Sequence, residues 1–488
     1  MYNLKTVPPE SEGVFSEDIL GFIEKINAYK MNIHSFIVAR RGNIVAEAYA
    51  KPVFNADFMH RLYSTSKSIV SLAVGKLYKE GKIGLNDKIC DYFPEFTADG
   101  VDPLVGETTI EDMLKMAVPH LTDSYSEVKN AGWAESFFKA KGVKPSGTIF
   151  DYNSSASFLL GVLVEKLTGK TFIDYLRPEF DEIGVGPVKC VKSPDGYAWG
   201  ASGVIMTARD LLRTGLLLLD KGCHNGKTLL PRDYIEKATG IRIANYVNND
   251  YTPRRAAGYG YQFWITDEGF STYGMGSQYV FCFPKKDMIV VVLGDTQVKT
   301  EDFCGEFLYE WASVIYKNAG KPTAAGNAYK KLKAALDDFS LPMIKPDVKT
   351  DYYKIVDGEK YILKDNPMRI EWIKIEFYNG YGTLYYKNAR GEKSVSFGLN
   401  SYKKGLFPEE EYYDMQVSAP SLRKFDYYAC GEWVEEKKLL IRLYIADTNL
   451  GNLFITLSYK NDEVGILMNK RAEFFLDDYE GVAMGKKL

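Results

Sequence analysis

A serine and a lysine stand three positions apart at the head of an apolar stretch, in the run Tyr63-Ser64-Thr65-Ser66-Lys67. If a helix begins at Ser64, the side chains of Ser64 and Lys67 lie on one face, a turn apart, and the amine can reach the hydroxyl. We expect burial and the positive end of the helix dipole to lower the pKa of Lys67, so that its amine can accept the proton of Ser64 near neutral pH. The pair is a candidate for an activated serine nucleophile that needs no histidine.

The apolar run after Lys67 distinguishes this pair from a chance match. Residues 69–77 leave almost no polar stripe on a helix, which predicts a helix that is buried on most sides. An amine near the end of such a helix is costly unless it serves a purpose. Four other S-x-x-K pairs lie in polar surroundings, where a solvated serine and lysine are the better interpretation: Ser126 with Lys129, Ser136 with Lys139, Ser401 with Lys404, and Ser421 with Lys424.

Strand patterns occur at both ends of the first 320 residues. Runs at 35–39 and 44–49 predict a hairpin, and runs at 259–265, 279–283 and 288–293 predict an antiparallel meander. The last run is apolar throughout, which is typical of a central strand covered on both faces. Helical patterns dominate the sequence in between. We therefore expect an α+β domain with a central antiparallel sheet, flanking helices and a helical insert.

The composition changes after residue 320. Residues 321–348 begin with a stretch rich in Gly, Ala and Pro, and they predict a linker with one short helix. Residues 349–488 contain alternating apolar and polar segments broken by Gly and Asn-Asp turns. We expect three parts: the α+β domain over residues 1–320, the linker, and an all-β C-terminal domain over residues 349–488 with a barrel-like or lipocalin-like fold.

Composition and charge exclude several classes of protein. The chain is 46% apolar and 26% charged with a net charge of −3, so we expect no nucleic acid partner. No stretch approaches a membrane span, and the N-terminus lacks the apolar core of a signal peptide. The six cysteines show no paired spacing, which predicts free thiols and a cytoplasmic location. Because no H-E-x-x-H or C-x-x-C motif occurs, we expect neither a metal nor another cofactor. The oligomeric state stays open.

Four short segments resemble the serine β-lactamase and penicillin-binding superfamily, in its class C-like, esterase and nylon-oligomer-hydrolase branch. Residues 64–67 match its S-x-x-K element, and PSGTIFDYNS at 145–154 resembles its P-x-G-x-x-F-x-Y-x-N element. ASGVIMTARDL at 201–211 is similar to the glycine-rich lead into its T-A-x-D-L helix. GMG at 274–276 occupies the place of its K-T-G or H-x-G element. The resemblance covers residues 8–320 and implies the β-lactamase-like fold.

The resemblance also implies a role for each matching residue. Ser64 attacks the carbonyl carbon of the substrate, and Lys67 and Tyr152 share the work of general base and acid. The backbone N–H groups of Ser64 and Ser277 form the oxyanion hole, where losing one donor costs about 3 kcal/mol in the transition state.

Two substrate-binding positions depart from the pattern of the family. Ser154 stands where Asn is usual, and its shorter side chain weakens a contact with the substrate. Gly274, Met275 and Gly276, with Gln278 beyond them, supply no Lys or His to hold the carboxylate of a β-lactam. We therefore expect a neutral amide, short peptide or ester as the substrate rather than a β-lactam.

The sequence thus predicts a serine hydrolase that cleaves an amide, peptide or ester bond of a small molecule through an acyl-enzyme on Ser64. An alternative stays open: a penicillin-recognising binding or sensor protein with little or no turnover. A Ser-His-Asp hydrolase is the rival enzyme, but its G-x-S-x-G motif is absent. His60, four residues before Ser64, is assigned a hydrogen-bonded structural role.

Overall fold

The structure, a computed structural model, describes residues 1–245, 257–297, 301–321, 326–344, 348–409, 424–472 and 475–488. The chain divides into two compact units, Met1–Phe339 and Ser340–Leu488. The first unit contains most of the helices around a seven-stranded sheet, and the second is built mainly of strands.

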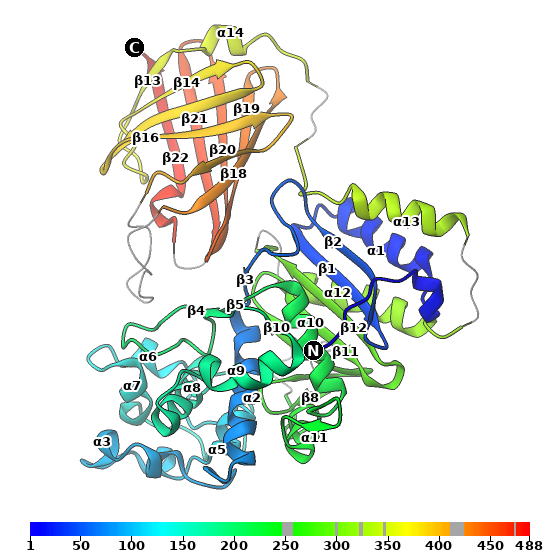
Figure 1. Cartoon of the computed structure of the whole chain (residues 1–488). Coiled ribbons are helices and arrows are strands. Elements are labelled where there is room, and N and C mark those ends of the chain that lie inside the picture. Colours follow the sequence, from blue (N-terminus) through cyan, green and yellow to red (C-terminus); the bar gives the residue numbers. More distant parts are fainter. Residues whose placement is uncertain (246–256, 298–300, 322–325, 345–347, 410–423, 473–474) are drawn as a thin grey trace. The chain divides into compact units, whose positions relative to one another are not determined.

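The seven-stranded antiparallel sheet organises the first unit (Figure 1). Its strand order, β2-β1-β12-β11-β10-β9-β8, joins two strands from the start of the chain to five that follow the helical insert. The predicted α+β architecture is therefore confirmed. The strands are β1 (Ile33–Arg40), β2 (Asn43–Tyr49), β8 (Gly258–Tyr259), β9 (Trp264–Thr266), β10 (Gly269–Gly274), β11 (Gln278–Phe283) and β12 (Met288–Gly294).

Helices cover both faces of this sheet. On one face, α10 (Ala208–Leu219) packs against β1, β11 and β12. On the other face, the ring of Phe22 in α1 (Ser16–Ala28) meets that of Phe36 in β1, and Tyr309 in α12 (Glu301–Asn318) meets Phe281 in β11. Because it is covered on both sides, β12 is buried along its whole length, as its apolar run predicts.

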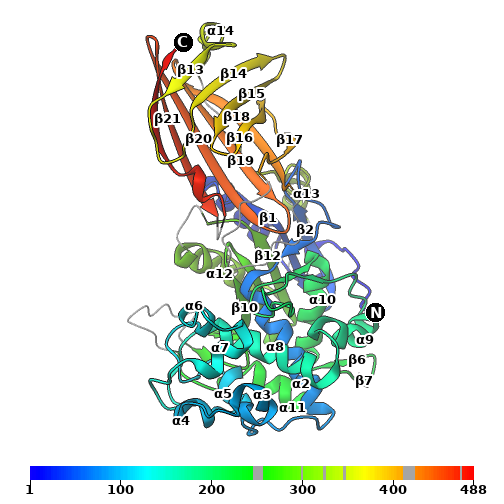
Figure 2. The ribbon, with the colours of Figure 1, turned by 90° about the vertical axis from the view of Figure 1, so that its left-hand side faces the viewer.

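The helical insert lies between β2 and β8, and its helices gather around α2 and α8 (Figures 1 and 2). Three short strands, β3 (His60–Arg61), β5 (Val204–Met206) and β4 (Lys189–Cys190), form a small sheet, and β6 (Cys223–His224) pairs with β7 (Lys227–Thr228). The helices of the insert, apart from α10, are α2 (Ser66–Lys79), α3 (Pro94–Thr97), α4 (Pro103–Gly106), α5 (Ile110–Leu114), α6 (Ser124–Glu127), α7 (Trp133–Lys139), α8 (Ser154–Thr168), α9 (Phe172–Ile183) and α11 (Arg232–Ala238).

The single strand predicted at 259–265 is wrong, because the chain turns within this segment and forms β8 and β9. Gln262 lies at the turn with φ of 68°, a left-handed conformation that a continuous strand cannot contain. The sequence analysis also missed β10, which pairs with β9 on one side and β11 on the other.

The first unit extends beyond residue 320. The short helix predicted within the linker is α13 (Asn327–Asp337), and it packs against α1 and β2. Leu332 of this helix is fully buried, and the ring of Phe339 lies edge-on to Phe36 at 5.4 Å. An amphipathic helix thus covers apolar surface of the first unit, which a linker would leave exposed.

The second unit is a closed β-barrel, as predicted. Nine strands follow one another in the order β16-β15-β14-β13-β22-β21-β20-β19-β18, and a parallel pairing of β16 with β18 closes the ring (Figure 2). Apolar and aromatic side chains, among them Tyr386, Phe397 and Trp433, pack in its core. Its elements are α14 (Tyr353–Val356), β13 (Lys360–Leu363), β14 (Trp372–Tyr378), β15 (Tyr381–Asn388), β16 (Gly391–Leu399), β17 (Lys403–Leu406), β18 (Asp426–Glu435), β19 (Lys438–Ala446), β20 (Leu450–Lys460), β21 (Glu463–Ala472) and β22 (Gly481–Lys487).

Candidate active site

Ser64 lies in a tight turn at the entrance to a buried helix. The turn, Tyr63–Thr65, is a 3-10 helix that leads directly into α2. Tyr63 has φ of 46°, in the left-handed region that aromatic residues rarely occupy. Backbone strain of this kind concentrates at functional sites. The turn leaves Ser64 half-buried while both of its neighbours are buried.

Two hydroxyl groups beside Ser64 fix the turn to its surroundings. Thr65 Oγ1 donates to the carbonyl oxygen of Gln278 at 2.9 Å. The backbone N–H of Val204 donates to Ser66 Oγ at 3.0 Å. These partners belong to β11 and β5, so tertiary contacts hold Ser64 in place in addition to the helix itself.

The Lys67 amine lies within hydrogen-bonding distance of Ser64. Its Nζ is 3.1 Å from Ser64 Oγ and donates to the carbonyl oxygen of Ala201 at 2.8 Å. The residue is only 1% exposed. A base must lie within about 2.6–3.2 Å of the heavy atom whose proton it takes, and the Lys67 nitrogen meets that condition for Ser64 Oγ.

Tyr152 lies against the same amine. Lys67 Nζ is 4.9 Å from the centre of the Tyr152 ring. The next residue, Asn153, caps α8 by accepting the backbone N–H of Ala156 at 3.0 Å. The Tyr152 ring also stacks on Trp264, with ring centres 5.6 Å apart and planes 24° from parallel. A helix cap and an aromatic stack therefore position the phenol.

Gly274, the last residue of β10, packs closely against the backbone that leads into Ser64. A Cβ atom on Gly274 would lie 2.3 Å from the carbonyl oxygen of Leu62, so no side chain fits there. Gly276 and Ser277 both have left-handed φ, 75° and 80°. Ser277 Oγ lies 2.6 Å from Thr296 Oγ1, and this contact anchors the non-glycine residue in its strained conformation.

Two of the residues that the sequence analysis assigned to substrate binding have structural contacts. Gln278 is fully buried, and its amide donates to the carbonyl oxygens of Met275 and Gly294, both at 2.8 Å. Its side chain therefore holds the β10–β11 turn against β12. The backbone N–H of Ser154 donates to Asp123 Oδ1 at the start of α8.

A buried pair of histidines, His34 in β1 and His60 in β3, is joined by a hydrogen bond. His60 Nδ1 faces the carbonyl oxygen of Arg61 at 2.9 Å, so this nitrogen carries the proton. His60 Nε2 then accepts from His34 Nδ1, also at 2.9 Å. Burial lowers the pKa of His60 to about 4, with a smaller opposing effect from the hydrogen bond to Arg61, so the ring is neutral at pH 7. These contacts agree with the structural role expected for His60.

The structure adds residues that sequence reasoning missed. Trp264 and Asp123 contact the candidate site, and no motif or spacing marks them in the sequence. The 201–211 motif includes Ala201, but the sequence did not show that its backbone carbonyl accepts from Lys67. Within the described ranges, no group of three or more His, Cys, Asp or Glu side chains could hold a metal ion. None of the helices in that same part of the chain combines the length and apolarity needed to span a membrane.

Comparison with known proteins identifies the family of the chain. The Beta-lactamase family profile matches residues 22–313. The 6-aminohexanoate-dimer hydrolase of Paenarthrobacter ureafaciens is 28% identical over 287 residues, which cover 53% of this chain and 71% of the relative. Esterase EstB of Burkholderia gladioli is 37% identical over 75 residues, 15% of this chain and 19% of the relative.

Solved structures share the fold of the first unit. A chain of Bacillus anthracis assigned as a 6-aminohexanoate-dimer hydrolase aligns with a TM-score of 0.51 at 20% identity, over 65% of this chain and 87% of its own length. The hydrolase EstCE1 aligns with a TM-score of 0.51 at 15% identity, over 62% of this chain and 99% of its own. Together with the matching profile, these findings show that the chain belongs to the Beta-lactamase family of serine hydrolases and their penicillin-binding relatives.

Proposed function

We propose that the protein is a serine hydrolase that cleaves a small amide, peptide or ester through an acyl-enzyme on Ser64. The observation that carries the proposal is the buried Lys67 amine at 3.1 Å from Ser64 Oγ. The names of its relatives, a 6-aminohexanoate-dimer hydrolase and an esterase, support a hydrolase of amides or esters.

The proposed reaction has two halves. Ser64 Oγ forms a bond to the carbonyl carbon while its proton passes to Lys67, with Tyr152 as the second proton carrier. The C–N or C–O bond then breaks, and the leaving nitrogen or oxygen takes that proton through Tyr152. Water adds to the acyl-enzyme in the reverse sense and releases the acid. The backbone N–H groups of Ser64 and Ser277 stabilise the oxyanion in both halves.

The same site favours substrates without a carboxylate near the bond that is cleaved. Residues 274–276 supply no cation at the β10–β11 turn, and the side chain of Gln278 is engaged in structural hydrogen bonds. We therefore propose that β-lactams are poor substrates and that the backbone of Gly274 to Ser277, with Ser154 opposite, contacts the substrate.

The two units have separate tasks in this proposal. Residues 1–339 carry the residues for catalysis, and the barrel has no assigned part in the chemistry. All six cysteines are free thiols, which favours a reducing compartment such as the cytoplasm.

Covalent labelling tests the proposal. A fluorophosphonate probe should add once per chain and mass spectrometry should locate it on Ser64, with labelling lost in Ser64→Ala. Ser126→Ala is the matched control, because Ser126 belongs to another S-x-x-K pair and is exposed. Absence of an adduct on the folded protein contradicts the proposal. A stable adduct without turnover of p-nitrophenyl esters would identify a binding protein instead.

A further inference from the structure

Arg61, three residues before Ser64, carries a charged group that the proposed reaction does not use. The residue is only 2% exposed, and it belongs to β3, which pairs with β5. Taking a guanidinium group out of water is costly unless hydrogen bonds and aromatic contacts replace those that water makes. The contacts of Arg61 therefore indicate what its buried position serves.

The guanidinium group of Arg61 connects two segments of the candidate site. Its carbon lies 4.6 Å from the centre of the Tyr63 ring, in the strained residue directly before Ser64, and 5.3 Å from the centre of the Trp199 ring. Its Nε donates to the carbonyl oxygen of Ser202 at 3.0 Å, and its Nη2 lies 3.4 Å from Ser202 Oγ. A planar guanidinium can stack on rings and donate from its edge at the same time, which an ammonium group cannot do.

Ser202 directly follows the residue whose carbonyl oxygen accepts from the Lys67 amine. That carbonyl belongs to Ala201, 2.8 Å from Lys67 Nζ, and the same nitrogen lies 3.1 Å from Ser64 Oγ. Residues 199–203 form turns between β4 and β5, so the place of this carbonyl depends on contacts with neighbouring segments. The hydrogen bond from the buried guanidinium to Ser202 is one such contact, one residue away from the carbonyl.

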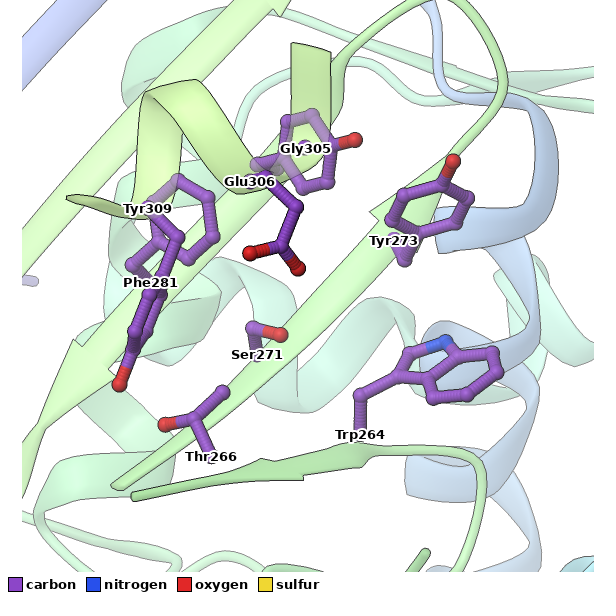
Figure 3. Close-up of a pocket in the computed structure, with 9 residues that line it drawn as sticks. Trp264, Thr266, Ser271, Tyr273, Phe281, Gly305, Glu306 and Tyr309 are labelled. Atoms are coloured by element: carbon purple, nitrogen blue, oxygen red, sulfur yellow. The ribbon is translucent and has the colours of Figure 1, made fainter. Parts of the chain in front are cut away.

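Another neighbour of the amine is positioned by different elements. The Tyr152 ring, 4.9 Å from Lys67 Nζ, stacks on Trp264. Figure 3 shows Trp264 on β9 and Tyr273 on the adjacent strand β10, and their ring centres are 6.1 Å apart. The phenol is thus fixed by the seven-stranded sheet, whereas the Ala201 carbonyl is fixed by the small sheet that contains β3 and β5, together with Arg61.

We propose that Arg61 is a positioning residue that acts through Lys67. It holds the segment of the Ala201 carbonyl against the turn of Ser64, so that the Lys67 amine keeps its distance from the hydroxyl. A displacement of about 1 Å between reacting groups can lower a rate about 100-fold, so this contact can matter greatly for turnover. The inference rests on the proposed function and deepens it by naming a residue that sets the geometry of the base.

A purely structural role is the alternative, and a second arginine provides the comparison. Arg177 of α9 donates from Nη1 and Nη2 to the backbone carbonyl oxygens of Gly186 and Val185, and its guanidinium carbon lies 5.7 Å from the centre of the Phe180 ring. It makes the same kinds of contact as Arg61, but its partners are not residues of the candidate site. Arg177→Met is therefore the matched control.

The kinetics of covalent labelling at Ser64 test the proposal. With a fluorophosphonate, the maximal labelling rate for each folded molecule should fall about 100-fold in Arg61→Met. It should fall about tenfold in Arg61→Lys, which keeps the charge and one donor but loses the planar edge. The reagent concentration that gives half of the maximal rate should not change, since Arg61 acts on the base and not on binding. Arg177→Met should label as wild type does once urea denaturation has corrected for the fraction folded.

A double variant separates action through Lys67 from a general effect on the fold. In protein that already carries Lys67→Met, adding Arg61→Lys should slow labelling by less than about threefold, because the amine that Arg61 positions is gone. A tenfold effect in both backgrounds, or unchanged labelling in Arg61→Lys alone, overturns the inference. Arg61→Lys decides the test by itself if Arg61→Met does not fold. Wild-type protein that takes no label at Ser64 contradicts the proposed function as well, whereas equal labelling of wild type and the Arg61 variants contradicts only the role of Arg61.

Discussion

Replacing Lys67 by methionine tests the central catalytic assignment. The change keeps a long apolar stem in a site that is 1% exposed and removes only the amine that reaches Ser64 Oγ at 3.1 Å. Loss of a positioned general base lowers kcat by about 10²- to 10⁴-fold, or about 3 to 5 kcal/mol in the transition state. The free energy of unfolding should change by only about 1 kcal/mol, since the lost hydrogen bond to Ala201 is offset by removal of a buried amine.

A second lysine on the same helix is the matched control. Lys76 is 8% exposed, and its Nζ donates to the Tyr175 carbonyl and to Glu179 Oε2, both at 2.7 Å. Lys76→Met leaves Glu179 without its partner in a mostly buried position and should cost about 2 to 4 kcal/mol of stability. Its kcat for each folded molecule should equal that of wild type, since Lys76 lies away from Ser64 along α2.

The two variants should therefore separate chemistry from stability. Urea denaturation gives the free energy of unfolding, and turnover of p-nitrophenyl butyrate, normalised to the fraction folded, gives kcat and KM. If Lys67→Met keeps kcat within about threefold of wild type, or if Lys76→Met loses as much turnover per folded molecule, Lys67 is not the base.

Two further predictions follow from the same geometry. Gly274→Ala places a Cβ 2.3 Å from the Leu62 carbonyl oxygen, and the forced shift should cost about 1 to 3 kcal/mol in unfolding and about 100-fold in kcat/KM. The control Gly326→Ala lies at the N-cap of α13, where a Cβ meets nothing within 4 Å, and it should leave kcat/KM unchanged while affecting stability only through the cap. Burial lowers the pKa of His60 from 6.5 to about 4, so its neutral ring stabilises the fold fully above pH 6.5. As the pH falls from 6.5 to 4, the free energy of unfolding should decrease by about 3 kcal/mol. His60→Gln should remove this dependence of the unfolding free energy on pH in urea melts measured across the same range. An unchanged slope in the variant would assign the acid sensitivity to other groups.

Local spacing explains what could be predicted for the site. Ser64 and Lys67 lie three residues apart on one helix, so the helical repeat alone brings them together. Apolar runs likewise predict β1, β11 and β12, because strands buried on both faces contain few polar side chains. The alternation in residues 349–488 predicts the strands of the barrel because successive side chains point alternately into its core and toward solvent.

Other features depend on contacts between distant parts of the chain. Gln278 lies two residues after the GMG segment, yet its side-chain amide donates to the carbonyl oxygens of Met275 and Gly294 and so supports the turn. The position of α13 was likewise not predictable, since only packing against α1 and β2 distinguishes it from a helix in a linker.

The sequence by itself determined the fold class and that Ser64 and Lys67 lie side by side, because these depend on helical and strand periodicity within short segments. Only the tertiary structure decided what surrounds them. Trp264 of β9 and Tyr152, just before α8, are far apart in the sequence, yet their rings stack beside Lys67. Periodicity describes which face of an element is buried, whereas the choice of partner across that face is set by packing of the whole chain.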